Sequence, residues 1–198
     1  MPEKNVDYRF LKDGRVELIN DYLQRYPAQV IVCPIDTTIS FEEGSVLQSL
    51  TADSTSVAPI LKAFKRKLGL SPGGVYVETQ QPDNSAVAYT FNVLTLYQDT
   101  TKGRASNNYL VSDTNTIRTA TETCLGVARL LKVESIGFPA LGTGRGRLSL
   151  EESLETMAPV IMHQMLCGIS SPTTVGILIP DAVKFRRAKK ILDKEFKP

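Results

Sequence analysis

The chain has 198 residues, a length typical of one domain with a full hydrophobic core. With 42% hydrophobic and 22% charged residues its composition is that of a globular protein, and a net charge of +2 is too small for a nucleic-acid-binding face. No apolar run approaches the ~20 residues that span a bilayer. We therefore expect a single domain, 1–198, with neither a nucleic-acid nor a membrane partner.

The opening residues 1–13 are polar and lack the pattern of a signal peptide, so we expect a cytoplasmic location. The cysteines are scattered and the sequence has a single histidine, which gives no metal-ligand spacing. We expect neither a metal nor a cofactor.

The N-terminal part of the chain predicts a strand, a helix and a second strand. Val6–Leu11 alternates between apolar and polar residues and ends at the turn signal Asp13–Gly14, which is typical of a strand. In Glu17–Tyr26, apolar residues recur at helical spacing until Pro27, so this segment is predicted to be a helix. The short apolar run Val30–Cys33 is typical of a strand buried on both faces.

A long polar segment, Ile35–Ser56, follows that strand directly. Because ligand crevices form at the carboxyl ends of strands in open α/β sheets, we expect this segment to contribute to a binding site. The next segment, Val57–Leu68, has an apolar stripe at helical spacing and a run of lysine and arginine that we interpret as its solvent-facing side.

The middle of the chain predicts two adjacent strands, a loop and a long helix. Val75–Thr79 and Ala86–Leu96 are rich in β-branched and aromatic residues, as strands are. Gln98–Thr114 contains few apolar residues and is predicted to be an exposed loop. In Thr116–Leu131 apolar residues recur at steps of three and four, which predicts a helix.

The C-terminal part alternates strongly between the two kinds of element. It predicts a strand at Ser135–Ala140, a helix at Leu150–Leu166 despite Pro159, a strand at Thr173–Ile179 and a helix at Ala182–Phe196. This order of elements predicts an α/β fold with a mixed, mostly parallel sheet of six strands, covered on both faces. We place Ser135–Ala140 at the centre of that sheet.

Three glycines spaced two residues apart follow the central strand: Gly142, Gly144 and Gly146. Glycine permits positive φ and a close approach of the backbone, so the N–H groups of such a loop can surround a phosphate. Thr143, Arg145 and Arg147 add a hydroxyl and positive charge, and Ser149 with Glu152 forms a capping-box pattern for the next helix. The spacing matches neither a Walker A loop nor a G-x-G-x-x-G fingerprint, and many glycine loops bind no ligand.

The sequence Phe138–Gly144, followed by Leu150–Ser153, resembles the second phosphate loop of macro domains. Macro domains are modules that bind ADP-ribose and, in some members, hydrolyse its derivatives. The order of elements also matches over nearly all of the chain, so the resemblance implies a three-layer α/β/α sandwich. In that family this loop wraps the diphosphate and the distal ribose, which implies ligand contacts from Ala140, Leu141, Gly142, Thr143, Gly144, Arg145, Gly146 and Arg147.

The first ligand loop departs from the macro-domain pattern. The family usually has an asparagine-rich segment after its second buried strand, and Asp36 stands where the asparagine that holds the distal ribose would be. The glycine-rich loop that follows in the family is reduced here to Gly44. Asp13 occupies the place after the first strand where the family has its adenine-selecting aspartate. The resemblance therefore implies further ligand contacts from Asp13, Ile35, Asp36, Gly44, Ser45, Val46 and Pro180.

Three functions stay open at this point. An intact second loop beside an altered first loop favours a reader module that binds ADP-ribose or a related nucleotide diphosphate with little catalysis. The alternative is an ADP-ribosyl hydrolase, which needs a positioned water or nucleophile and a group that takes its proton. Its candidate catalytic residues are Asp36, Glu42 and Glu43, and Asp36 is favoured among them because it stands at the carboxyl end of the strand. The third is a macro-like interaction scaffold without nucleotide binding. The expected partner of a reader or a hydrolase is an ADP-ribose-type small molecule or an ADP-ribosylated protein.

Overall fold

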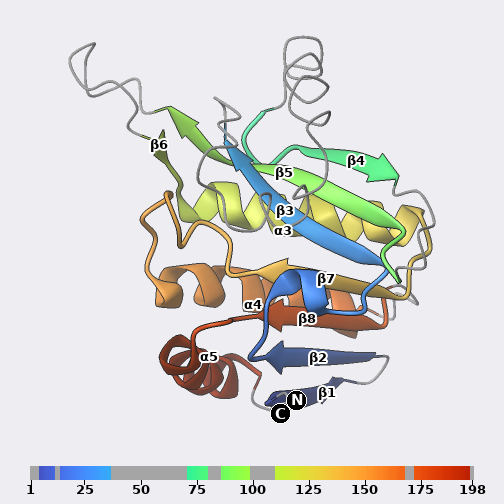
Figure 1. The fold of residues 1–198 in the computed structure, drawn as a ribbon, viewed down its shortest axis with the longest axis vertical. Helices are drawn as coiled ribbons and strands as arrows, with labels where there is room; N and C mark the ends of the chain where they lie inside the picture. The colour runs from blue at the N-terminus through green and yellow to red at the C-terminus, as the bar shows by residue number, and fades with distance from the viewer. Residues whose placement is uncertain are drawn as a thin grey trace.

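The computed structural model describes residues 5–11, 14–36, 71–79, 86–98, 110–167 and 172–196. Figure 1 shows how the strands and helices of these ranges are arranged. The strands are β1 (Val6–Leu11), β2 (Gly14–Ile19), β3 (Val30–Asp36), β4 (Val75–Thr79), β5 (Tyr89–Gln98), β6 (Leu110–Val111), β7 (Ser135–Pro139) and β8 (Thr174–Leu178). The helices are the short 3-10 helix η1 (Leu23–Arg25), α3 (Thr114–Leu130), α4 (Leu150–Leu166) and α5 (Ala182–Glu195).

The described strands form one mixed sheet in the order β1-β2-β8-β7-β3-β5-β4, with β6 paired to β5. Strands β2, β8, β7, β3 and β5 run parallel, whereas the outer strands β1 and β4 are antiparallel to their neighbours. The carboxyl ends of the parallel strands therefore share one edge, at the left of Figure 1, which we call the carboxyl edge. Since β7 pairs with both β8 and β3, the predicted central position of this strand is confirmed.

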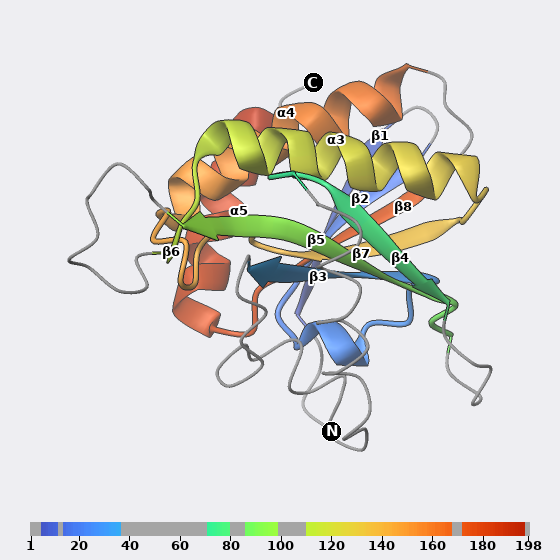
Figure 2. The same cartoon turned by 90° about the horizontal axis from the view of Figure 1, so that it is seen from above.

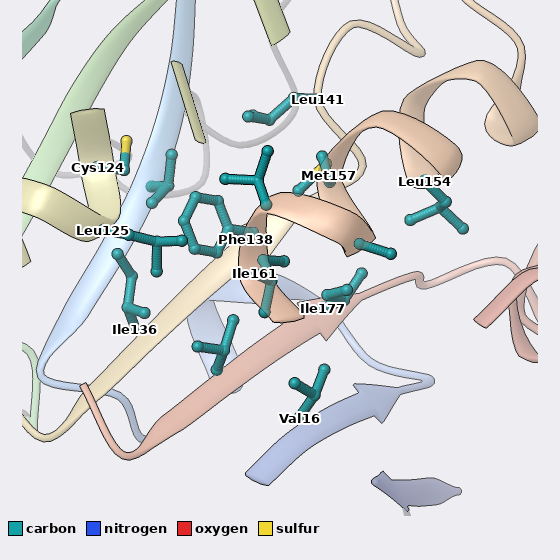
Figure 3. Packing of buried hydrophobic residues seen from close by; sticks show 14 of the residues in the cluster. Val16, Cys124, Leu125, Ile136, Phe138, Leu141, Leu154, Met157, Ile161 and Ile177 are labelled. Atoms are coloured by element: carbon teal, nitrogen blue, oxygen red, sulfur yellow. The ribbon is translucent and has the colours of Figure 1, made fainter. Parts of the chain in front are cut away.

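One face of the sheet is covered by α3, α4 and α5. Figure 2 shows α3 and α4 lying across the sheet, and alternate residues of the strands point into this layer. Phe138 and Ile136 of β7, for example, lie between Leu125 of α3 and Ile161 of α4 (Figure 3). Burial of these side chains is the main favourable term that holds the helices on the sheet.

On the opposite face of the sheet lie η1 and, directly after it, Tyr26. Gly137 and Gly176 lie opposite each other in adjacent strands, and the ring of Tyr26 packs so closely over them that a Cβ at Gly176 would come within 2.6 Å of it. The Tyr26 hydroxyl donates to Glu17 Oε2 at 3.0 Å, and Arg15 Nε donates to Glu17 Oε1 at 2.6 Å. Burial, together with the Glu17 carboxylate, raises the pKa of Tyr26 above its usual range. The hydroxyl therefore stays protonated and continues to donate to the buried carboxylate.

The predicted helix Glu17–Tyr26 is wrong, because β2 occupies its first part and only η1 is helical. Val16 and Leu18 face the layer of α3, α4 and α5, whereas Glu17 and Ile19 face η1, so side chains alternate with the period of a strand. A strand that is buried on both faces has consecutive apolar residues. The apolar residues of β2 and those of η1, read together, have the spacing expected of a helix. The additional strand also means that the sheet is larger than the six strands predicted.

The other predicted elements within the described ranges are confirmed in type, and so is the α/β class. Strand β3 extends beyond the predicted strand through Pro34, and α4 continues through Pro159. The predicted loop Gln98–Thr114 is partly wrong, because β6 lies within it. The predicted helix Val57–Leu68 lies outside the described residues. In the part of the chain that is described, no helix is both long and apolar enough to cross a bilayer.

Candidate functional site

The glycine loop, Gly142–Arg147, leaves β7 at the carboxyl edge and leads into α4. Two backbone hydrogen bonds close the loop on itself: Leu148 N donates to Gly142 O at 3.1 Å, and Arg147 N donates to Gly144 O at 3.2 Å. Arg147 adopts φ +61°, a left-handed conformation that non-glycine residues seldom adopt and that costs about 1–2 kcal/mol. The loop thus has a definite shape that its own backbone maintains.

The three glycines of the loop have different surroundings. Gly142 has φ +78°, and a Cβ there would also come within 2.8 Å of Leu148. At Gly146 a Cβ would lie 2.5 Å from the carbonyl oxygen of Gly142. At Gly144 a Cβ would have no neighbour within 4 Å among the described residues. Gly142 and Gly146 are therefore needed for the shape of the loop, whereas Gly144 leaves an open surface at its tip.

Thr143 and Gly144 form that tip. The Thr143 hydroxyl donates to Ala140 O at 2.8 Å, which ties the tip back to the end of β7. The backbone N–H groups of Thr143 and Gly144 have no acceptor within the ranges that the structure covers. Unpaired N–H groups on a fixed loop are the arrangement that binds phosphate oxygens, so the tip is a candidate anion site.

The loop rests on the segment that precedes α3. Ser112 N donates to Gly146 O at 3.3 Å, and the Ser112 side chain lies against both Gly142 and Gly146. Leu141, at the start of the loop, is completely buried. The Ser112 hydroxyl is also buried and has no hydrogen-bond partner in the part of the chain that the structure describes. The loop is therefore supported on two sides, by the end of β7 and by Ser112.

Asp113 lies next to this support and caps α3. Its carboxylate accepts from Thr116 N at 2.7 Å and from the Tyr97 hydroxyl. Burial favours the neutral acid, but the hydrogen bonds from Tyr97 and Thr116 outweigh it and lower the pKa of Asp113 below its usual value. Because these structural bonds engage the carboxylate, we do not consider Asp113 a candidate base.

The start of α4 satisfies its own backbone groups. Ser149 Oγ accepts from Glu152 N at 3.1 Å, and Glu152 Oε2 accepts from Ser149 N at 2.8 Å, which confirms the predicted capping box. The hydrogen bond from Ser149 N also lowers the pKa of Glu152. With a carboxylate already at the helix start, an anion would be held by the loop tip rather than by α4.

Strand β3 ends beside β7 at the same edge. Its pairing with β5 shifts between Ile35 and Asp36, which lie opposite Leu94 and Leu96 and skip Thr95. Such a bulge redirects the end of a strand. Ile35 is buried, and the buried Thr95 hydroxyl has no hydrogen-bond partner among the residues described. Asp36 closes the strand, but its side chain lies outside what the structure describes.

The ends of β2 and β8 complete the carboxyl edge. Pro180 follows β8 and is exposed, and Asn20 Nδ2 donates to Ile179 O at 2.8 Å and to Pro180 O at 3.0 Å. Asp21 follows Asn20 and accepts from Arg25 Nη1 at 3.5 Å. Sequence reasoning missed both Asn20 and Asp21 because it placed them inside a helix. Because β2 is buried on both faces, its sequence has no clear alternation of apolar and polar residues that would have placed them at a strand end.

Comparison with known proteins agrees with this architecture. Residues 100–157, which include α3, β7 and the glycine loop, match the family model described as Macro domain. The Oceanobacillus iheyensis macrodomain with ADP superposes with a TM-score of 0.77 at 12% identity, over 97% of each chain. The Thermus aquaticus DarG macrodomain gives 0.64 at 17% identity, over 84% of this chain and 99% of the other. No curated protein matches the sequence significantly.

The chain has the macro-domain fold. The predicted resemblance to the macro-domain family is confirmed by the family match together with these structures. A third structure, the Trypanosoma brucei macrodomain in complex with ADP, covers 89% of this chain and 68% of its own length, with a TM-score of 0.68 and 12% identity.

The carboxyl edge brings together the ends of β3, β7 and β8, and with them Ile35, Pro180 and the glycine loop. Four other predicted ligand residues lie outside the described residues: Asp13, Gly44, Ser45 and Val46. Gly14, which follows Asp13, begins β2 at the opposite edge, where Arg15 N donates to Thr173 O. Within the described ranges, no three histidine, cysteine, aspartate or glutamate side chains gather as metal ligands would.

Proposed function

We propose that this macro domain binds ADP-ribose or a related nucleotide diphosphate through the Gly142–Arg147 loop and acts as a reader with little catalysis. The observation that carries the proposal is the loop tip, where the N–H groups of Thr143 and Gly144 have no acceptor in the described chain and the surface above Gly144 is open. The hydrogen bonds that close the loop fix its shape before the ligand arrives, which reduces the entropy lost on binding.

The known macrodomains support the choice of ligand. The Oceanobacillus iheyensis and Trypanosoma brucei structures contain ADP, and a variant of the former contains ADPR. We infer that the diphosphate lies over Thr143 and Gly144, with Arg145 and Arg147 adding positive charge around it. Pro180 and the end of β3 would then line the two sides of the ligand.

The first test is a pair of matched substitutions. Gly144→Glu places bulk and negative charge on the loop tip, where no other described residue lies within 4 Å of the added Cβ. Gly126→Glu adds the same side chain on α3, where a Cβ also has no neighbour within 4 Å. Calorimetric titration with ADP-ribose should show at least a tenfold loss of affinity, about 1.4 kcal/mol, for Gly144→Glu. Gly126→Glu should bind as the parent does. Equal affinities for the two variants would contradict the phosphate role of the loop.

Arg145→Ala measures how much the positive charge on the loop contributes to binding, apart from the shape of the loop. A surface arginine contributes mainly a screened attraction, so we expect a smaller loss of affinity that shrinks as salt is added. The Gly144→Glu effect should retain its steric part at high salt. AMP and NAD, titrated alongside ADP-ribose, would report which part of the nucleotide is recognised, and no heat with any of the three would favour an interaction scaffold.

A hydrolase is the second candidate, because Asp36 ends β3 at the same edge as the loop. Incubation with a mono-ADP-ribosylated protein should release little ADP-ribose if the reader proposal is right. If ADP-ribose is released fast and Asp36→Ala abolishes the release, the protein is a hydrolase rather than a reader, with Asp36 as the basic or orienting group.

A further inference from the structure

Strand β1 is one of the two outermost strands of the sheet, and one of its faces carries two exposed aromatic side chains. It lies at the lower end of the sheet in Figure 1, and among the described strands it pairs with β2 alone. Tyr8 is 50% exposed and Phe10 is 77% exposed, and their rings stack at 6.1 Å between centroids. Edge strands of monomeric proteins are usually protected against pairing by charges, prolines or bulges on the exposed side. Two stacked aromatic rings offer no such protection.

The backbone groups of β1 that point away from β2 can be identified from the register. Asn20 N donates to Asn5 O at 3.0 Å, so Asn5 and Asn20 form a directly hydrogen-bonded pair. In an antiparallel ladder such pairs alternate, so Asp7, Arg9 and Leu11 also bond to β2. The N–H and C=O groups of Val6, Tyr8 and Phe10 therefore point outward, to the free edge.

We propose that β1 pairs antiparallel with β1 of a second copy of this chain, about a two-fold axis at Tyr8. In that register Tyr8 lies opposite Tyr8, and Val6 lies opposite Phe10. These are the residues whose backbone groups point outward, so each pair can exchange two hydrogen bonds. The sheets of the two copies become continuous, and the aromatic rings of both strands gather on one face, where cross-strand aromatic pairs are favourable.

The charges on the other face select this register. Asp7 and Arg9 flank Tyr8, so the two-fold axis places Asp7 of each copy opposite Arg9 of the other. A shift of two residues in one direction would place Asp7 opposite Asp7, and a shift in the other direction would place Arg9 opposite Arg9, both unfavourable. Arg9 already pairs with Asp7 and with Asp193 of α5, each at 2.6 Å, so these side chains are held in place before association. The strand is thus complementary to itself in charge as well as in hydrogen bonding.

Disulfide trapping tests the register. The background is Cys167→Ser, because Cys167 is exposed whereas Cys33 and Cys124 are buried. Tyr8→Cys should form a cross-linked dimer under mild oxidation, because Tyr8 is its own partner. Phe10→Cys lies on the same face but opposite Val6, and Thr79→Cys is exposed on β4, the other outermost strand, so neither should cross-link. Equal cross-linking of all three variants, or none by Tyr8→Cys, would overturn the proposal.

Sedimentation velocity of the otherwise unmodified chain tests the association itself. The parent should shift towards a dimer as its concentration rises. Tyr8→Pro removes one outward N–H while every bond from β1 to β2 remains, since Tyr8 does not donate to β2. The Tyr8→Pro variant should therefore stay monomeric. The control is Tyr8→Thr, which keeps the N–H and should still associate. The thermal unfolding midpoints of the two variants should be close. A parent that is monomeric at all concentrations, or a Tyr8→Pro variant that dimerises as the parent does, would rule out pairing through β1.

Discussion

At the glycine loop, residues of one type fulfil two different requirements. Gly142 adopts a positive φ and Gly146 allows a close backbone approach, so a side chain at either position strains the loop. Gly144 meets neither restriction, and its lack of a side chain leaves the tip open instead. Sequence alone could not separate these roles, because the spacing is regular and the distinction depends on how the loop folds back on Gly142 O and Leu148 and on its contact with Ser112, which is distant in sequence.

Stability measurements on alanine variants test this division. Gly146→Ala places a Cβ 2.5 Å from Gly142 O, and such overpacking costs about 1–3 kcal/mol. Gly144→Ala should stay within about 0.5 kcal/mol of the parent, as an unconstrained surface position does. The two free energies of unfolding, from urea titrations of both variants, should therefore differ clearly. A Gly144→Ala variant as unstable as Gly146→Ala would show that the tip is more constrained than its open surroundings imply.

The sequence predicts a helix or strand well when several of its signals, such as apolar spacing and capping residues, agree. Helices α3, α4 and α5 are long, strongly periodic and capped by Asp113, Ser149 and Asp181, so pattern and capping indicate the same boundaries. The β1–β2 hairpin lacks this agreement, because β2 is apolar on both faces and a short strand of that kind resembles a helix segment. Strand β6 has two residues, Leu110 and Val111, and is too short to show a detectable periodicity.

The cap of α5 provides a pH-dependent prediction. Asp181 Oδ1 accepts from Val183 N at 2.9 Å and from Lys184 N at 2.8 Å, and chiefly the Lys184 bond lowers the pKa of Asp181. A lowered carboxyl pKa contributes stability above the unfolded-state pKa and loses it as pH falls through the folded-state value. Asp181→Ala should therefore lower the unfolding midpoint at neutral pH, and the difference from the parent should shrink in acid.

Asp181→Asn is the control for that measurement, because asparagine keeps an acceptor for the cap but does not titrate. Its unfolding midpoint at neutral pH should lie between those of the parent and Asp181→Ala, and its gap to Asp181→Ala should not change in acid. A constant gap between the parent and Asp181→Ala from neutral to acid pH would argue that the ionised cap does not stabilise α5.

For the whole molecule, the sequence predicts the order of layers better than it predicts the site. The loop glycines and the central strand are contiguous in the chain, so a short motif reveals both. The remaining edge is assembled from β2, β3 and β8, which are distant in sequence, and the positions of Asn20 and Pro180 emerge only when β2 and β8 pair. No local pattern carries that information.

The core on the α3–α4 face should dominate global stability. Phe138 is completely buried on the central strand, so Phe138→Ala should cost about 3–5 kcal/mol through lost burial and the cavity left behind (Figure 3). Leu130→Ala removes an apolar side chain that is 78% exposed on α3 and should change stability by less than about 0.5 kcal/mol. Calorimetric melting of the two variants should show a large shift for the first only. Similar shifts would place the stabilising core elsewhere.

The pairing of β2 with β8 has a consequence for synthesis of the chain. Asn20 and Ile179, which bond at the junction of these strands, are 159 residues apart in sequence. While the chain emerges from the ribosome, β2 and the Glu17 carboxylate beneath Tyr26 cannot complete their native contacts until Gly176 and its neighbours in β8 have been synthesised. Until then β2 pairs only with β1, and a two-stranded hairpin alone is only marginally stable. Contacts so distant along the chain slow folding and prolong the time in which unpaired strands are exposed. The nascent β1–β2 hairpin is therefore the segment on which a chaperone that binds extended apolar chain would act for longest.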